Sequence, residues 1–389
     1  MRETEAWVLH QGARQKHGQP QSAALVREPF TIGDIADDEV LAEPIYGCWE
    51  GNMTHALERV PVDVCRFRRE PRVVLGNAGV VRVVTVGSAV TDLAPGDVRM
   101  VFPNAEPDAA GYMVKALAYD ARKTMGLLAR QSRLPRRCLF PIPPGSRYSL
   151  RQWAAFSLRY VTAWSNWHLA FGCYRLQMTA AACPQPFVVA WGGGVALGQL
   201  ILAQRDGCKV AMIASTDQRL AALRDLGIIG IDRRDFVHLY HDPDRHHTDA
   251  EYRRRYDEAE TTFLARIAQA GGGQPVAVFI DHIGAPVYRA TLAALGRQGV
   301  ITSAGWKHGA DLVSTRRATE CISRHLHINT HYASDAEGLA ATAFAEKHGW
   351  LPPIEGERVY RWDEIPDLAR DYAQGQVESY FPLFQVNEE

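Results

Sequence analysis

The sequence predicts an α/β protein in which a parallel sheet with helical crossovers interrupts a β-rich domain. Three observations lead to this prediction. The chain has 389 residues, which suits two medium-sized domains. Short apolar strands alternate with helical patterns between residues 157 and 333. The flanking segments 1–156 and 334–389 mix strands, turns and helices, so we expect them to fold together as one discontinuous domain.

The composition excludes several classes of protein. Hydrophobic residues make up 47% of the chain, which allows a sizeable core and argues against disorder. The 43 Lys and Arg residues balance 44 Asp and Glu residues, so the basic excess typical of nucleic-acid or membrane-surface binding is missing. No apolar run reaches the ~18 residues that span a bilayer, and the first ten residues lack a signal-peptide core. We expect a cytoplasmic protein without nucleic-acid or membrane partners.

The cysteines support a reducing compartment. None of them forms a CxxC pair, and their scatter fits free thiols better than a disulfide framework. The seven positions are Cys48, Cys65, Cys138, Cys173, Cys183, Cys208 and Cys321.

The β-rich part is predicted from two strands and the turns around them. Residues 39–45 form the first inward strand, and residues 80–86 form a β-branched strand that follows the turn at 76–79. Residues 150–170 carry aromatic side chains at helical spacing. The Gly- and Pro-rich turns and breaks lie at 87–90, 94–97 and 141–145.

The alternating part repeats a strand–helix unit. One segment, 238–265, is highly charged, and we interpret it as an insertion that contains a solvated helix. The tail returns to a mixture of helix and strand. The predicted strands are 187–190, 209–214, 276–280, 299–303, 358–361 and 381–386, and the predicted helices are 195–205, 217–226, 288–295, 335–347 and 364–374.

A glycine-rich turn predicts dinucleotide binding. Gly192, Gly193 and Gly194 follow a buried strand and open a helix, in which Gly198 lies one turn further on. Small residues let a pyrophosphate approach the backbone, and the helix N-terminus offers N–H groups and positive potential. The spacing is not a clean GxGxxG, because Leu197 occupies the third position. An ordinary strand-to-helix turn is the alternative to a Rossmann-type site.

The end of the next strand favours NADPH over NADH. An NAD site places an acidic residue there to bind the ribose 2′-hydroxyl. Here Ser215 and Thr216 occupy that place, and Arg219 lies within reach of a 2′-phosphate. Asp217 reads as a first-turn acid of the following helix. The alternative is that Arg219 is only a surface charge.

No metal site is predicted. Cys48 is the one thiol near the first inward strand, and the turn at 76–79 has no Gly-His-Glu run. The histidines at 238, 241, 246 and 247 lie in the charged segment and read as a solvated surface. There is no GxSxG, and hydride transfer needs a proton source rather than a protein nucleophile. The candidate proton donors are Tyr46, Glu50, His55, Tyr160 and His331.

At this point the motifs resemble a known family. Residues 86–98 (VGSAVTDLAPGDV) resemble the VGxxVxxxxxGDxV signature of medium-chain dehydrogenases/reductases. Residues 76–80 (GNAGV) are similar to the GNEG turn of the zinc-free enoyl-thioester reductases. The likeness extends to crotonyl-CoA carboxylase/reductases and covers nearly the whole chain. The further matching runs are 160–164, 191–198, 231–236, 279–284 and 328–331.

The resemblance implies a Rossmann-type domain, 157–333, inserted into a GroES-like catalytic domain. It also implies a zinc-free, NADPH-dependent reductase of an enoyl thioester bound to CoA or an acyl carrier protein. Hydride would reach the β-carbon and a proton the α-carbon. The family's carbon-dioxide-binding stretch has no match at 111–117. Of the residues that would hold carbon dioxide, only His331 is retained, so we expect reduction without carboxylation. A reductase of a free enone, quinone or other biosynthetic intermediate, and a non-catalytic NADPH-binding protein, remain alternatives.

Site residues and an assembly are predicted as well. Members of the superfamily pair the last strands of their dinucleotide sheets, which here predicts a homodimer through 299–303 and 311–314, with a tetramer as the alternative. Tyr46, His55 and His331 are the predicted catalytic residues, and Glu50, Asn52 and Asn77 the predicted substrate-binding residues. The predicted cofactor-binding residues are Thr162, Gly192, Gly193, Gly194, Gly198, Ser215, Thr216, Arg219, His282 and Gly305.

Overall fold

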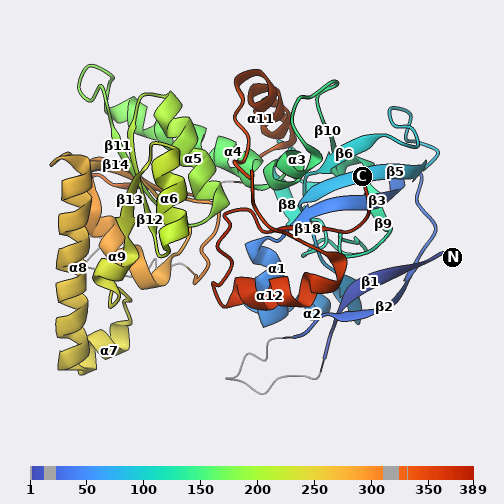
Figure 1. The fold of residues 1–389 in the computed structure, drawn as a ribbon, viewed down its shortest axis with the longest axis horizontal. Helices are drawn as coiled ribbons and strands as arrows, with labels where there is room; N and C mark the ends of the chain where they lie inside the picture. Colours follow the sequence, from blue (N-terminus) through green and yellow to red (C-terminus); the bar gives the residue numbers. More distant parts are fainter. Residues whose placement is uncertain (1, 13–22, 310–323, 331) are drawn as a thin grey trace. The chain divides into compact units, whose positions relative to one another are not determined.

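The protein is described by a computed structural model covering residues 2–12, 23–309, 324–330 and 332–389. The chain divides into two compact units (Figure 1). Unit 1 comprises Met1–Val161 and Ala333–Glu389, and unit 2 comprises Thr162–Tyr332.

A small antiparallel sheet in unit 1 was not predicted. It contains β1 (Arg2–His10), which lies between β2 (Val26–Ile32) and β4 (Arg72–Val74). The charged residues that open β1 and the exposed, Pro-containing β2 hide the period-2 pattern on which strand prediction depends. Their strand character is fixed by pairing with residues distant in the sequence.

The larger sheet of unit 1 contains seven strands: β3 (Glu39–Cys48), β5 (Gly79–Val86), β6 (Val98–Val101), β9 (Ser132–Pro135), β10 (Leu139–Pro141), β17 (Val359–Tyr360) and β18 (Leu383–Gln385). β3 is paired along both edges. One edge bonds to antiparallel β5, and the other bonds first to β9 and then to β18. Both sequence segments of unit 1 therefore contribute to one sheet. The hairpin of β7 (Asn104–Pro107) and β8 (Met113–Ala116) is separate.

The predicted helix at 150–170 is interrupted. α3 (Leu150–Phe156) begins with a capping box between Ser149 and Gln152. It ends before α4 (Arg159–Gln177), and at this break the Ser157 hydroxyl donates to the Ala154 carbonyl and accepts a bond from the Gly79 amide. The other helices of unit 1 are α1 (Gly51–Glu58), α2 (Val64–Arg68), α11 (Asp335–His348), α12 (Ile365–Ala373) and the 3-10 turns Arg136–Cys138 and Trp362–Glu364.

Unit 2 contains the predicted parallel sheet, so the α/β fold class is confirmed. In spatial order its strands are β13 (Ile229–Asp232), β12 (Lys209–Ala214), β11 (Phe187–Trp191), β14 (Val276–Asp281), β15 (Leu295–Ser303) and β16 (His327–Thr330). The prediction that 299–303 forms an edge is wrong, because β16 pairs with β15 and covers it. The second predicted edge segment, 311–314, lies outside the described residues.

Helices cover both faces of this sheet (Figure 1). α5 (Gly194–Arg205) and α6 (Asp217–Asp225) lie on one face, and α8 (Ala250–Gly271) and α9 (Ala285–Ala294) lie on the other. The second face holds the main apolar core of the unit, in which Trp191 stacks on Phe263 with ring centroids 5.2 Å apart. The unit also contains α7 (Pro243–Thr248) and a 3-10 turn, Arg233–Phe236.

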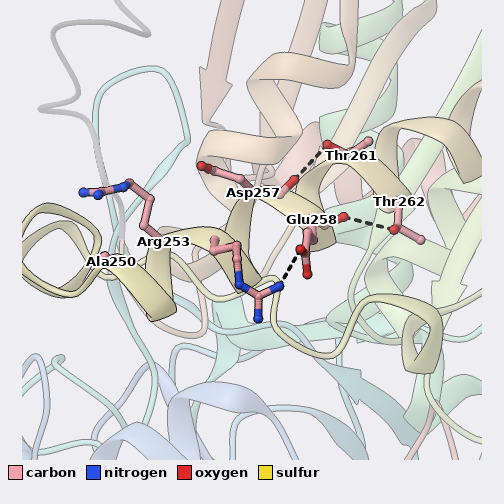
Figure 2. Close-up of a pocket in the computed structure, with 7 residues that line it drawn as sticks. Ala250, Arg253, Asp257, Glu258, Thr261 and Thr262 are labelled. Carbon is pink, nitrogen blue, oxygen red and sulfur yellow. Dashed lines mark hydrogen bonds and ion pairs between the residues drawn. The ribbon is translucent and has the colours of Figure 1, made fainter.

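The charged segment 238–265, which was predicted as an insertion that contains a solvated helix, is part of the crossover from β13 to β14. It contains α7 and most of α8, and α8 buries Tyr256, Ala259 and Phe263 against the sheet. The opposite face of α8 forms a shallow depression with charged and hydroxyl side chains (Figure 2). There Arg254 pairs with Glu258, and the hydroxyl of Thr261 bonds to the Asp257 carbonyl. The charges in the sequence thus describe one face of a helix whose other face is core.

Candidate functional site

The glycine turn stands at the carboxyl end of β11. Gly192 has a φ of +137° and faces the side chain of His282, where an added Cβ would lie 3.3 Å from the His282 Cβ. Gly193 is the N-cap of α5, and no side chain caps this end. The turn therefore has the open backbone and helix N-terminus that suit a phosphate. Gly194 and Gly198 lie buried in α5.

His282 follows β14 and has both ring nitrogens engaged. The Ala304 amide donates to Nδ1 at 3.2 Å, and Nε2 lies 2.9 Å from the Gln199 Oε1. Burial lowers the pKa of His282 to about 4, so the ring is neutral at physiological pH. The predicted cofactor residue is thus a neutral bridge between α5 and the turn after β15.

A buried carboxyl beside His282 was not predicted. Asp281 accepts the amides of Ile283 and Gly284 at 2.8 and 2.9 Å, and the Thr291 hydroxyl at 3.0 Å. Thr291 in turn accepts the indole N–H of Trp191 at 2.9 Å. Burial raises the pKa of Asp281 to about 6. The carboxyl closes the turn after β14 through two local amides, and the Thr291 hydroxyl ties it to α9.

The turn after β15 contains the predicted Gly305. Its amide donates to the Ser303 hydroxyl at 3.0 Å, and residues 307 and 308 bond to the backbone of residues 282 and 283. Gly284 must be glycine here, because at φ +92° an added Cβ would lie 2.0 Å from the Gly309 carbonyl oxygen. Thr162 is buried in α4, and its carbonyl accepts the side-chain amide of Asn166.

The predicted 2′-phosphate residues lie at the end of β12. Ser215 is exposed, whereas the hydroxyl of Thr216 caps α6 by accepting the Arg219 amide at 3.2 Å. The Thr216 hydroxyl is therefore engaged in a structural bond. Arg219 is half-buried at the same helix start.

Two arginines that the sequence analysis did not single out follow β13. Arg234 forms ion pairs with Asp232 and Asp217 at 2.6 and 2.5 Å. Arg233 is half-buried with its guanidinium 5.6 Å from the centroid of the Trp191 ring, and no described acidic side chain pairs with it. Burial lowers the pKa of Arg233. A cation without an anion at the carboxyl edge of a parallel sheet suits a phosphate-bearing ligand.

The predicted residues of unit 1 have unequal exposure. Tyr46 is buried, its hydroxyl accepts the Arg151 Nε at 3.2 Å, and burial raises its pKa. His55 and Asn52 are half-buried on α1, and Asn77 is buried in the turn before β5. Within the described ranges, the side-chain oxygens of Asn52 and Asn77 accept no hydrogen bond from the protein. These two acceptors are suited to a ligand or water donor.

Glu50, a predicted substrate residue, is held inside unit 1. Its carboxylate pairs with Arg159 at 2.8 Å, and the two side chains are 7% and 5% exposed. Arg159 also donates to the carbonyls of Trp49 and Tyr380 at 2.6 Å. Each of these buried charges thus has a partner of opposite charge inside unit 1. The sequence contains no local signal for the pairing, because Arg159 is distant along the chain.

Three further predictions concern His331, metal ligands and membrane-spanning helices. His331 lies outside the described residues. Among the described side chains, no three His, Cys, Asp or Glu residues come together as a metal site. The described helices include none long and apolar enough to cross a membrane.

The sequence matches no protein-family model and no curated protein. Solved structures do resemble it. The crotonyl-CoA carboxylase/reductase AntE in complex with NADP is 21% identical with a TM-score of 0.77, and the alignment covers 99% of this chain and 95% of that one. The 2-octenoyl-CoA carboxylase reductase CinF, in complex with NADP and 2-octenoyl-CoA, is 20% identical with a TM-score of 0.77 and coverage of 98% and 87%.

Alcohol dehydrogenases share the architecture as well. A cinnamyl alcohol dehydrogenase from Sorghum bicolor is 17% identical with a TM-score of 0.71, covering 100% of this chain and 99% of that one. At such identities the likeness is one of fold. Both β-rich and parallel-sheet parts are matched, since the alignments span nearly the whole chain. The chain therefore has the fold of the medium-chain dehydrogenase/reductase superfamily.

Proposed function

We propose that this protein is an NADPH-dependent reductase of an α,β-unsaturated carbonyl compound, with an enoyl thioester as substrate and without carboxylation. Arg233 is the observation that carries the proposal. Its half-buried guanidinium has no acidic partner in the described part of the chain. It stands at the edge of the sheet where doubly wound proteins bind nucleotides. The 2′-phosphate of NADPH would supply the missing anion.

Two further observations support the choice of reaction. The signature at 86–98 and the turn at 76–80 resemble zinc-free enoyl-thioester reductases. Among the similar structures, two reductases hold NADP, and one of these also holds 2-octenoyl-CoA. The absence of the carbon-dioxide-binding stretch from residues 111–117 favours reduction alone.

The residues of unit 2 fit the parts of NADPH. The turn Gly192–Gly194 and the uncapped start of α5 would hold the pyrophosphate. Ser215 and Arg233 would hold the 2′-phosphate. Arg219, which lies four residues after Ser215, is the further candidate. Thr162 and the turn at Gly305 would border the nicotinamide. The bound cofactor supplies the hydride that the β-carbon receives.

Tyr46 and His55 are the described candidates for donating the proton to the α-carbon. Tyr46 is buried, and burial raises its pKa, which weakens it as an acid. His55 is half-buried and is the more accessible candidate among the described residues. Replacing each in turn, by Phe and by Gln respectively, distinguishes them, because loss of the proton donor lowers kcat more than it changes substrate affinity.

The donor set near Cys48 does not fit zinc. Cys48 is fully buried, and burial raises the pKa of its thiol, which disfavours the thiolate that zinc binds. Its acidic neighbour Glu50 is already paired with Arg159. We therefore propose that the reaction proceeds without zinc.

A substrate panel tests the proposal. Loss of NADPH is measured with crotonyl-CoA, a crotonyl-loaded carrier protein, a cyclic enone and a quinone, each with and without bicarbonate. We expect thioester turnover that bicarbonate does not change, and slower turnover with NADH. Turnover of only the enone and the quinone contradicts the thioester substrate. Tight NADPH binding without turnover on any of them favours the non-catalytic alternative. A homodimer stays a prediction, which the molar mass in solution tests.

A further inference from the structure

The imidazole of His282 determines the orientation of a buried amide. A backbone N–H can only donate, so the Ala304 amide fixes the His282 Nδ1 as an acceptor. A neutral imidazole then carries its proton on Nε2. That proton requires an acceptor, so the atom of Gln199 that faces it at 2.9 Å must be the carbonyl oxygen. Tautomer and amide orientation follow from one backbone bond.

The hydrogen bonds from Gln199 through His282 to Ala304 join three segments of the predicted dinucleotide site. Gln199 belongs to α5 and is fully buried. His282 follows β14 and also contacts the glycine turn, since a Cβ at Gly192 would lie 3.4 Å from its Cδ2. Ala304 belongs to the turn after β15. We infer that Gln199 is a positioning residue, which acts through His282 to hold the 303–305 turn beside the glycine turn for dinucleotide binding.

The inference rests on the proposed function, but its geometry does not depend on a bound ligand. Burial is the largest influence on the pKa of His282; a backbone hydrogen bond at Gly305 acts in the opposite direction, and no charged side chain does. The carboxyl of neighbouring Asp281 is directed to other donors, at Ile283, Gly284 and Thr291. The imidazole therefore stays neutral and keeps both bonds across the physiological pH range. A space-filling role for Gln199 predicts that removing its acceptor oxygen leaves the Ala304 amide and cofactor binding unchanged, whereas a positioning role predicts that both change.

The first experiment uses the full-length chain without cofactor. Nitrogen-15 NMR of the imidazoles, with His282 assigned by a His282→Asn variant, should show the Nε2–H tautomer and no titration between about pH 5.5 and 8. Hydrogen exchange should show a protected Ala304 amide. Gln199→Met keeps the size but removes the acceptor, and it should expose that amide to faster exchange. Gln204→Met, at the other end of α5, is the control and should not.

The second experiment replaces the acceptor by a charged one. Gln199→Glu keeps the hydrogen bond, but a carboxylate beside the imidazole favours its protonated form. Titration of His282 should then appear within the physiological range. Protonation of Nδ1 would then release the Ala304 amide between about pH 5.5 and 8 in this variant but not in the wild type. An Nδ1–H tautomer in the wild type, or a Gln199→Glu variant whose His282 does not titrate, overturns the inference.

The third measurement links the bonds to the cofactor. Gln199→Met should raise the Kd of NADPH about tenfold, the size expected when a buried donor loses its acceptor. Gln204→Met should leave the Kd unchanged. If the wild type binds no NADPH, the proposed function fails while the amide and tautomer results still decide the hydrogen-bonded chain. If NADPH binds and Gln199→Met leaves its Kd unchanged, the positioning role is wrong.

Discussion

Two adjacent arginines at the end of β13 have opposite environments. Arg234 is exposed and pairs with Asp232 and Asp217. Arg233 is half-buried beside Trp191 and has no acidic partner in the described ranges. Since a guanidinium without a counter-charge is costly to bury, we expect an anion from outside the chain to complete its neighbourhood. Arg234 is therefore a matched control for substitutions of Arg233 that test the selectivity for NADPH over NADH.

Arg233→Ala should weaken NADPH binding about 10–100-fold, because a hydrogen bond to a charged group contributes about 1.5–3 kcal/mol. NADH, which lacks the 2′-phosphate, should bind the variant as it binds the wild type. Arg234→Ala should change neither affinity by more than a factor of about three, since its charge is already paired. Fluorescence titration with both cofactors measures these constants. Equal losses for NADPH and NADH would contradict the assignment.

Asp281 should give unit 2 a distinct pH dependence. Its folded-state pKa of about 6 lies above the ordinary value, so its stabilising contribution is complete below about pH 4 and is lost as pH rises through 6. Asp281→Asn cannot ionise, and it should become more stable relative to the wild type by up to about 3 kcal/mol between pH 4 and 7. Urea denaturation across that range measures the difference. Asp225→Asn, on exposed α6, is the control, and a pH-independent difference for Asp281→Asn would refute the prediction.

At the scale of elements, α8 has two chemically different faces. Phe263 is fully buried and stacks on Trp191 with an interplanar angle of 17°. Thr261 and Asp257 lie on the opposite, exposed face (Figure 2). The helix thus anchors the ring beside which the turn at Gly192 begins. Its apolar face, rather than its many ion pairs, is expected to stabilise the unit.

Phe263→Ala should lower the free energy of unfolding by about 3–5 kcal/mol, the usual cost of deleting a buried aromatic ring. Thr261→Ala should cost less than about 0.5 kcal/mol, because it alters an exposed hydroxyl on the same helix. Chemical denaturation of both variants provides the comparison. Similar losses for the two variants would mean that α8 is not anchored by the Trp191 contact.

At the scale of the whole molecule, opposite charges nearly cancel. The net charge is −1, and the isoelectric point is about 6.9. Molecules with little net charge repel each other weakly, so association is favoured near that pH. Solubility should therefore pass through a minimum near pH 7 and recover at pH 8.5. Light scattering of matched samples across this range measures it, and a minimum near pH 5 would contradict the charge argument.

What could be predicted from the sequence was local. The strand at 209–214 and the glycine turn are recognisable because their pattern lies within a few neighbouring residues. β1 and β2 escaped prediction, since their identity depends on pairing with each other and with β4. In the candidate site, His282 was predicted as a cofactor-binding residue by resemblance. Its partner Gln199 is 83 residues away and carries no motif of its own.

The antiparallel pairing of β3 with β18 has a consequence for how the chain is made. Cys48 and Leu383 lie opposite each other, so the end of one edge of β3 stays open until the last strand leaves the ribosome. At about 5–20 residues per second, that delay is on the order of half a minute. Nascent chains with an open edge are prone to pair with one another. Chaperone capture during synthesis would therefore protect this protein at one identifiable strand, and slower translation would prolong the risk.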